Sequence, residues 1–272
     1  MSGPSAEVVA AFGWTGADPR LLAGGQGGTW LAGDIVLKLV DNVDEHTWVS
    51  NVLAGLGDGA TLRTPTPLRS VAGTWSFGGW SAHRYVAGET LSMATDAPVI
   101  RSAGEAFHAQ VSHLARPALL DRRDDPWAFG DRVAWEGAAA SGSPETRELV
   151  EAAMSAYRPV LGTSQPVHGD LAGNVLGGPG LVPAVIDWPP YWRPAGWSLA
   201  VAAVDGVCWD GAPPSIFDDW ADVEEWDQML LRALVYRVAT VGRTEHDGHP
   251  KVTPLVHADR VRPVLECVLG RI

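Results

Sequence analysis

The sequence predicts an α+β protein of 272 residues in which a strand-rich part precedes a larger helical part. Short apolar runs separated by glycine-containing turns occupy residues 21–40 and 68–86, which is typical of antiparallel hairpins. Beyond residue 96 the apolar residues recur at the three- and four-residue spacing of helices. Strands and helices in separate stretches indicate the α+β class. We expect two domains, residues 1–86 and 87–272.

The first domain is expected to contain two helices and two hairpins. Ser2 or Ser5 can cap a short helix within residues 4–14. A strand, a glycine-rich loop and a hairpin turning at Gly33-Asp34 follow. The remaining expected elements are a helix over residues 43–56 and strands over residues 68–71 and 80–86.

The second domain is expected to be mostly helical. Ser143 followed by Pro144 predicts an N-cap and first position of a helix that ends near Leu161. A helix over residues 96–114 would present one apolar face, formed by Val99, Ala103, Ala106, Phe107, Val111 and Leu114. Other helices are expected at residues 131–137, 198–205, 229–241 and 251–269.

Composition narrows the class of protein. A net charge of −12 argues against nucleic-acid binding, which favours a basic face, but it is compatible with a cationic small molecule. The hydrophobic content of 46% is spread over runs well short of the roughly 18 residues that span a membrane. Residues 1–14 lack the pattern of a secretory signal. We therefore expect a cytoplasmic protein with no membrane partner, in which Cys208 and Cys267 are reduced core residues.

The candidate catalytic and metal-binding side chains lie between Val167 and Asp187. Asp170 and Asn174 follow one apolar run, and Asp187 follows another, Ala184-Val185-Ile186. The Gly/Pro turn at residues 177–180 would fold the runs into a hairpin. Carboxylate and carboxamide oxygens suit Mg²⁺ together with substrate phosphates, and a carboxylate free of metal can accept a hydroxyl proton. The stretch therefore predicts a phosphoryl-transfer site.

The run His168-Gly169-Asp170-Leu171 with Asn174, followed by Ile186-Asp187-Trp188, resembles the catalytic loop and metal-binding Asp of the aminoglycoside phosphotransferase-like kinases. That family is a small-molecule branch of the protein-kinase fold. The resemblance implies a bilobal fold, with a small β-sheet lobe bearing one main helix and a larger helical lobe. It also implies ATP and Mg²⁺, Asp170 as catalytic base, Asn174 and Asp187 as metal ligands, and His168 as a packing residue.

One spacing departs from the kinase pattern. Kinases have four residues between the loop Asp and Asn, whereas Asp170 and Asn174 are separated by three. Either the loop is tighter, with Gly173 accommodating the strain, or Asn174 is not a ligand. We favour the tighter loop, because apolar Val175 and Leu176 still follow Asn174.

The resemblance also assigns nucleotide contacts in the first domain. Lys38 is the only charge in the strand 35–40, where kinases carry the lysine that pairs with phosphates and with a helix Glu, here Glu45. An edge-strand lysine is the alternative interpretation. The remaining expected nucleotide contacts are Gly25, Gly27 and Gly28 of the glycine loop, and Arg84, Tyr85 and Val86 of the hinge between lobes.

The acceptor is expected to be a small hydroxyl compound. The segment after Asp187 is short and rich in proline and aromatic residues, unlike a segment that docks a protein substrate, and it supplies Trp192 and Arg193. Arg193 could contact either a phosphate or a surface carboxylate. Asp218 and Asp219 open an acidic run that could bind substrate ammonium groups or merely form a solvated helix start. An aminoglycoside or amino sugar fits the resemblance. The alternative is a nucleotide-binding pseudokinase, an interaction protein. The sequence does not predict the oligomeric state.

Overall fold

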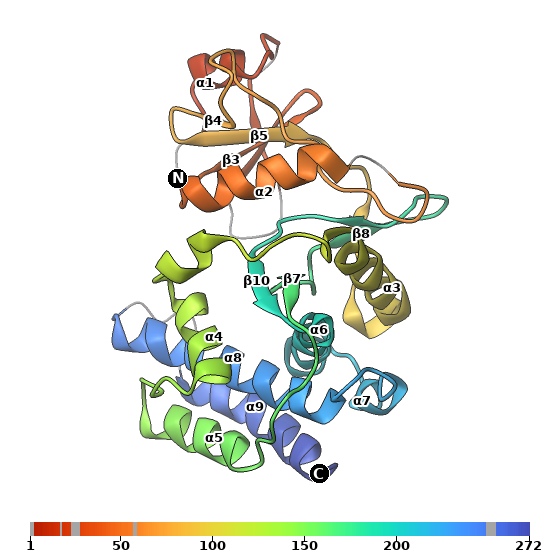
Figure 1. Cartoon of the computed structure of the whole chain (residues 1–272). Helices are drawn as coiled ribbons and strands as arrows, with labels where there is room; N and C mark the ends of the chain where they lie inside the picture. The colour runs from red at the N-terminus through yellow and green to blue at the C-terminus, as the bar shows by residue number, and fades with distance from the viewer. Residues whose placement is uncertain (1–2, 17, 23–27, 57–58, 249–253) are drawn as a thin grey trace. The chain divides into compact units, whose positions relative to one another are not determined.

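The computed structural model describes residues 3–16, 18–22, 28–56, 59–248 and 254–272 (Figure 1). The chain divides into two compact units, each described by itself below. The first comprises residues 1–90 with 175–188, and the second comprises residues 91–174 with 189–272. The sequence-based boundary at residue 86 stays a prediction.

An antiparallel sheet organises the first unit, with its strands in the order β1-β2-β3-β5-β4. The pairing of β2 with β3 ends at Ala32 opposite Ile35, so Gly33 and Asp34 form a two-residue turn. Gly33 adopts a φ of 60°, a conformation that favours glycine. The predicted hairpin is therefore confirmed. The strands are β1 (Arg20–Leu21), β2 (Thr29–Ala32), β3 (Ile35–Leu39), β4 (Ser76–Phe77) and β5 (Trp80–Arg84).

Helix α1 (Ala6–Ala11) covers this sheet and helix α2 (Val43–Leu56) follows β3. The Ser5 hydroxyl caps α1 by accepting from the Val8 N–H at 3.3 Å, as predicted. Burial removes apolar area from water, which is the main force holding α1 on the sheet. The shared core consists of Val8, Val9, Phe12, Ala32, Ile35, Leu37, Trp80 and Ala82.

The predicted strand at residues 68–71 is wrong. Pro67 forms only an isolated bridge with His83, and the Leu68 N–H donates to the Ala82 carbonyl at 2.8 Å. Beyond Leu68 the backbone turns away from β5, because the Ser70 N–H donates to the Thr74 carbonyl and the Val71 N–H donates to the Ala11 carbonyl, each at 2.8 Å.

A second small sheet of the first unit contains the hairpin predicted around the Gly/Pro turn. Strand β8 (Val175–Gly177) pairs antiparallel with β9 (Ala184–Val185) and with β6 (Glu89–Thr90). Gly88 is required beside it, because a Cβ there would lie 3.0 Å from the Gly177 carbonyl oxygen.

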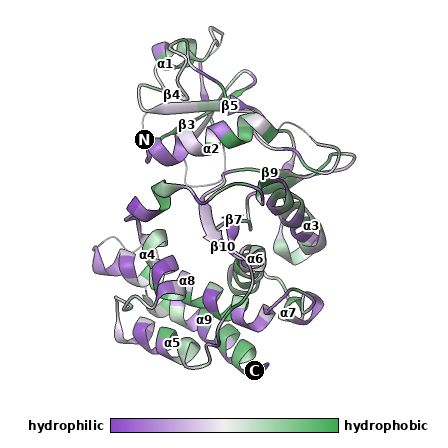
Figure 2. Ribbon diagram, in the orientation of Figure 1, coloured by the Kyte–Doolittle hydropathy of each residue, from purple (hydrophilic) through white to green (hydrophobic). Residues whose placement is uncertain are grey.

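The second unit is a helical assembly around α8 (Trp226–His246), which packs against α4, α5, α6 and α9 (Figure 1). Helices α4 and α5 mix hydrophilic and hydrophobic positions, as expected for helices with one face on the core (Figure 2). A ribbon of β7 (Gln165–His168) and β10 (Pro190–Arg193) lies in the same unit. The other elements are α3 (Met93–Val111), a 3₁₀ helix η1 (Ala118–Arg122), α4 (Pro126–Glu136), α5 (Pro144–Ser155), α6 (Ala195–Trp209), α7 (Ile216–Asp219) and α9 (Pro254–Leu269).

Three expectations for the helical unit need correction. Val99 is exposed, because the buried face of α3 is centred on Ile100, Ala103 and Phe107. Helix α5 begins at the predicted cap but ends at Ser155, well before residue 161. Cys267 is exposed on α9, whereas Cys208 is buried as expected.

None of the helices in the described part of the chain combines the length and apolar character needed to cross a bilayer.

Candidate active site

The loop between β7 and β8 is anchored on both sides of Asp170. Leu171 is fully buried, while the Asp170 side chain keeps 46% of its surface exposed. Gly169 lies against the Tyr191 ring, where an added Cβ would come within 2.1 Å of a ring carbon. The loop therefore holds its backbone in the core and presents one carboxylate toward solvent.

His168 shapes this loop, as the sequence predicted for a packing residue. Its side chain is buried, and its Nδ1 accepts the Asp170 N–H at 3.1 Å. Its carbonyl accepts the Ser198 hydroxyl at 2.5 Å, and its own N–H donates to His108 Nε2 at 3.2 Å. Burial, with a smaller contribution from His168, lowers the pKa of His108 to about 3, so that ring stays neutral and can accept.

Asn174 closes the loop onto Asp170. The Asn174 Nδ2 donates to the Asp170 carbonyl at 2.7 Å and lies 3.4 Å from Asp170 Oδ2. Gly173 adopts a φ of 79°, the left-handed conformation that a three-residue spacing was expected to require. The contacts use the amide nitrogen of Asn174, whereas a metal would bind its carboxamide oxygen.

An arginine that the sequence analysis missed contacts Asp170. Arg237 Nη2 donates to Asp170 Oδ1 at 2.5 Å, and the same guanidinium forms a two-point pair with Asp205, in which its Nε donates to Asp205 Oδ1 at 2.8 Å. Burial raises the pKa of Asp205 to about 6, although Arg237 opposes the rise. The sequence does contain a signal for Arg237, which, like Lys38, is a charged residue within an otherwise apolar run, here residues 233–239.

Lys38 and Asp187 form an ion pair in the first unit. Lys38 comes from β3 opposite Ser81, and Asp187 follows β9 with a φ of 53°. The two side chains keep 29% and 44% of their surface exposed. Burial lowers the pKa of nearby His83, and the positive charge of Lys38 adds to that effect. The edge-strand interpretation of Lys38 fails, because β3 lies between β2 and β5.

The other predicted nucleotide contacts belong to the glycine loop, to helix α2 and to the predicted hinge. Gly25 and Gly27 lie outside the described residues, and Gly28 directly precedes β2. Glu45 lies in the first turn of α2, where its N–H donates to Asn42 Oδ1 at 3.1 Å; its pairing with Lys38 stays a prediction. At the predicted hinge, Arg84 pairs with Asp34 at 2.5 Å, the Tyr85 N–H donates to the Asp34 carbonyl, and Val86 follows.

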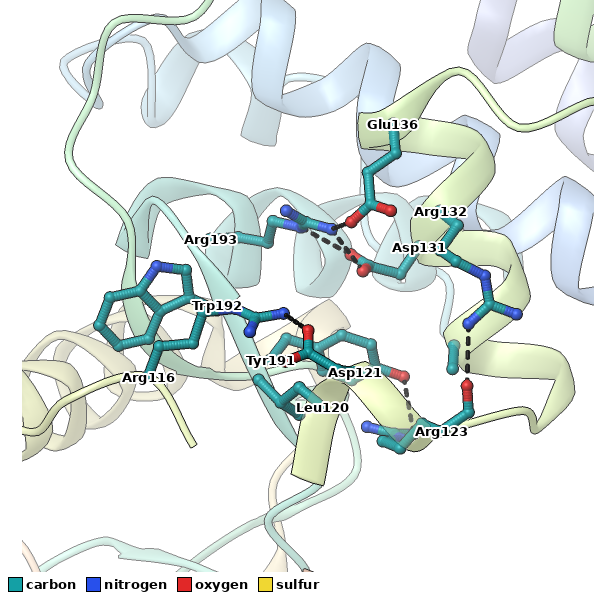
Figure 3. A pocket seen from close by; sticks show the side chains of 11 residues that line it. Arg116, Leu120, Asp121, Arg123, Asp131, Arg132, Glu136, Tyr191, Trp192 and Arg193 are labelled. Carbon is teal, nitrogen blue, oxygen red and sulfur yellow. Dashed lines mark hydrogen bonds and ion pairs between the residues drawn. The ribbon is translucent and has the colours of Figure 1, made fainter. Parts of the chain in front are cut away.

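Trp192 and Arg193 line a hollow of about 140 Å³ in the second unit (Figure 3). The Arg193 guanidinium points to Asp131 and Glu136, at 2.6 and 2.9 Å. Arg116 pairs with Asp121 on another wall at 2.7 Å. Tyr191 connects this hollow to the catalytic loop, because the same ring lies against Gly169.

The acidic run after α6 is engaged in structural contacts. Asp218 and Asp227 both pair with Arg271, and Asp222 pairs with Arg101 at 2.6 Å. Asp219 lies exposed on α7, beside a hollow between α3 and α7. Substrate contacts by Asp218 and Asp219 stay a prediction.

The donor chemistry fits Mg²⁺. Among the described residues, no group of three or more His, Cys, Asp or Glu side chains is arranged to hold a metal ion. Mg²⁺ in phosphoryl-transfer sites needs only one or two protein oxygens, the rest coming from phosphates and water. The Asp187 carboxylate and the Asn174 carboxamide are each an oxygen donor of the kind that Mg²⁺ prefers; that they bind one ion together stays a prediction.

The fold and these loops define a phosphotransferase of the kinase-like class. A model of the phosphotransferase enzyme family matches residues 33–197, which is more than half of the chain. The chain belongs to this family and is a small-molecule kinase, as the resemblance implied. Family membership does not support the pseudokinase alternative.

Solved structures show the same fold. A spectinomycin phosphotransferase is 15% identical with a TM-score of 0.61, covering 97% of this chain and 96% of that one. The aminoglycoside phosphotransferase APH(4)-Ia is 15% identical with a TM-score of 0.63, covering 93% and 96%. A choline/ethanolamine kinase family protein from Mesorhizobium loti is 17% identical with a TM-score of 0.57, covering 97% and 92%. No curated protein matches the chain by sequence.

Proposed function

We propose that the protein transfers the γ-phosphoryl group of ATP to a hydroxyl group of a small acceptor, with an aminoglycoside or amino sugar as the first class to test. The observation that carries the proposal is the half-exposed carboxylate of Asp170, held by its own loop and by Arg237. Solved relatives support the ligand classes, since one holds ADP with spectinomycin and another holds ADP with hygromycin B.

In this reaction the acceptor oxygen forms a bond to the γ-phosphorus, and the bond from that phosphorus to the β–γ bridging oxygen breaks, releasing ADP. Asp170 orients the hydroxyl and takes its proton as transfer proceeds. Lys38 contacts the phosphates, and Glu45 orients Lys38. Asn174 and Asp187 would hold Mg²⁺, which supplies positive charge to the phosphates. Most of the acceleration comes from positioning and charge neutralisation.

The nucleotide is proposed to contact the glycine loop and the backbone of residues 84–86. The acceptor is proposed to approach Asp170 from the hollow lined by Trp192 and Arg193, because Tyr191 forms part of its wall and lies against Gly169. Asp218 and Asp219 are a second set of proposed acceptor contacts.

The test is an ADP-release assay with Mg-ATP against a panel of aminoglycosides, amino sugars, plain sugars and amino alcohols. Turnover on one acceptor should fall by at least about a hundredfold in Asp170→Ala and in the near-isosteric Asp170→Asn. Retention of wild-type turnover by these variants would refute the role of Asp170. If the whole panel is inactive and ATP fails to raise the melting temperature, ATP binding itself is refuted.

A further inference from the structure

Arg237 is a buried charge at a position where α8 is otherwise apolar. Its side chain keeps 12% of its surface exposed, and its neighbours on the helix include the buried Val235, Tyr236 and Val238. Burying a guanidinium is strongly unfavourable unless charged partners and hydrogen bonds compensate for its lost hydration. An arginine at this position therefore indicates a specific set of contacts.

Asp205 provides the main compensation. Its carboxylate, 13% exposed, receives two hydrogen bonds from Arg237, from Nε and from Nη2. Planar two-point pairing fixes the guanidinium in orientation as well as in position. The negative charge of Asp205 is enough to neutralise the positive charge of Arg237. The contact between Arg237 and Asp170 is therefore not needed for charge neutrality.

That additional contact selects one oxygen of Asp170. Arg237 Nη2 donates to Oδ1 at 2.5 Å, while the Asp170 backbone is held by His168 through its N–H and by Asn174 through its carbonyl. Fixing Oδ1 determines the side-chain rotation of Asp170 and therefore the direction of Oδ2.

We propose that Arg237 is a positioning residue, which holds the Asp170 carboxylate through Oδ1 and directs Oδ2 toward the acceptor hydroxyl, with Asp205 fixing the guanidinium. The inference rests on the proposed function, in which Asp170 is the base. An arginine beside a base reduces its proton affinity, but a loose phosphoryl-transfer transition state requires orientation of the hydroxyl more than a strong base. Within the loop, the Asp170 carboxylate receives a 3.4 Å contact from Asn174 Nδ2 at Oδ2, and Arg237 adds the shorter hydrogen bond at Oδ1.

The test uses Arg237→Lys with Arg232→Lys as the matched control. Arg232 lies on the same helix and is similarly buried, but it contacts Gln228 and the Arg158 carbonyl rather than Asp170. A lysine has one nitrogen and cannot serve Asp205 and Asp170 with the same geometry. Arg237→Lys should lower kcat by about tenfold to a hundredfold, while the acceptor KM and the ATP-induced rise in melting temperature stay within about twofold. Arg232→Lys should leave kcat unchanged.

A double-mutant cycle separates positioning from general destabilisation. In the Asp170→Asn background, Arg237→Lys should reduce residual turnover by less than about twofold, because the carboxylate that it positions is gone. If Arg237→Lys lowers turnover in the Asp170→Asn background by the same factor as in the wild type, the inference is overturned. If Arg237→Lys does not fold, the paired change Arg237→Gln with Asp205→Asn removes both buried charges together and should give the same kcat loss.

Crystal structures provide a readout that needs no acceptor. In Arg237→Lys the Asp170 carboxylate should leave its present rotamer or become disordered, and an unchanged carboxylate would overturn the inference. The experiments distinguish failure of the proposed base, Asp170, from failure of the proposed positioning residue, Arg237. Wild-type turnover in Asp170→Asn would refute the base, whereas loss in Asp170→Asn with wild-type kcat in Arg237→Lys would refute only the positioning role.

Discussion

At the residue scale, the one-residue deletion in the catalytic loop is accommodated by a single glycine. Gly173 adopts a φ of 79°, and nothing lies within 4 Å of the position that its Cβ would occupy. The need for glycine is therefore conformational rather than steric. The Asn174 N–H can then reach the Leu171 carbonyl at 3.1 Å, which closes the loop.

Gly173→Ala should lower the free energy of unfolding by about 1 kcal/mol, since a side chain disfavours the left-handed region. It should also lower turnover by about tenfold, because the loop presents both Asp170 and Asn174. Denaturant unfolding and the ADP-release assay measure the two effects.

Gly211→Ala is the matched control, because Gly211 has a φ of 74° and equally open space but follows α6. It should cost similar stability without loss of turnover. Equal turnover in both variants would refute a role for the tight loop in catalysis.

At the scale of elements, α3 and β7 are joined through two buried histidines. His108 of α3 accepts the N–H of His168 at the end of β7, and His168 in turn accepts the N–H of Asp170. The loop that carries Asp170 is thus connected to α3 through two imidazole rings.

This connection predicts acid sensitivity. Burial lowers the pKa of His108 to about 3 in the folded protein, below the usual value of 6.5. The unfolded chain therefore binds a proton that the folded protein does not between those values, and stability falls as pH decreases from 6.5 toward 3. The contribution of His108 is about 1.4 kcal/mol per pH unit in that window.

Unfolding curves between pH 4 and 7 measure this slope. His108→Gln, which keeps an acceptor for the His168 N–H, should have a shallower slope than the wild type. The exposed His113→Gln is the control and should keep the wild-type slope. An identical slope in His108→Gln would show that protonation of another group dominates.

At the scale of the whole molecule, the proposed phosphate contact and one proposed metal ligand belong to the first unit, whereas the proposed base and the other proposed metal ligand, Asn174, belong to the second. Lys38 and Asp187 lie in the first unit, whereas Asp170 and Arg237 lie in the second. Nucleotide binding and proton transfer can therefore be separated by mutation.

Lys38→Met should abolish most of the Mg-ATP-induced rise in melting temperature. The ion pair with Asp187 is partly exposed, so its removal should change the stability of the free protein by no more than about 1 kcal/mol. Thermal unfolding with and without Mg-ATP measures both quantities, since a native-state ligand raises the midpoint.

Arg262→Met is a suitable control, because it breaks a comparably exposed pair, with Glu148 at 3.2 Å, outside the proposed site. It should keep the full ATP response. A full response in Lys38→Met would remove Lys38 from the nucleotide site.

Much of this protein can be predicted from its sequence, because local patterns carry that information. The limits of α2, the Gly33-Asp34 turn, the Ser143 cap and the β8–β9 hairpin depend on propensities and turn chemistry within a few residues. The Asp170, Asn174 and Asp187 set was also proposed from the sequence, because its residue types and their order resemble the family motif, and its catalytic and metal-binding roles stay predictions. Errors arose where local signals are ambiguous, as at residues 68–71, whose backbone donors at Ser70 and Val71 bind the Thr74 and Ala11 carbonyls rather than a strand, and at Cys267, whose burial depends on helix rotation.

Tertiary structure alone decided which distant groups meet. Arg237 reaches Asp205 and Asp170, which lie 32 and 67 residues earlier, because α8 packs against α6 in the second unit. Lys38 likewise meets Asp187 across 149 residues. Such pairs depend on how helices and strands pack rather than on any periodicity. The sequence by itself therefore determined which acidic and amide side chains the loop of residues 169–174 carries, and the packing of α8 determined which distant group contacts the Asp170 carboxylate.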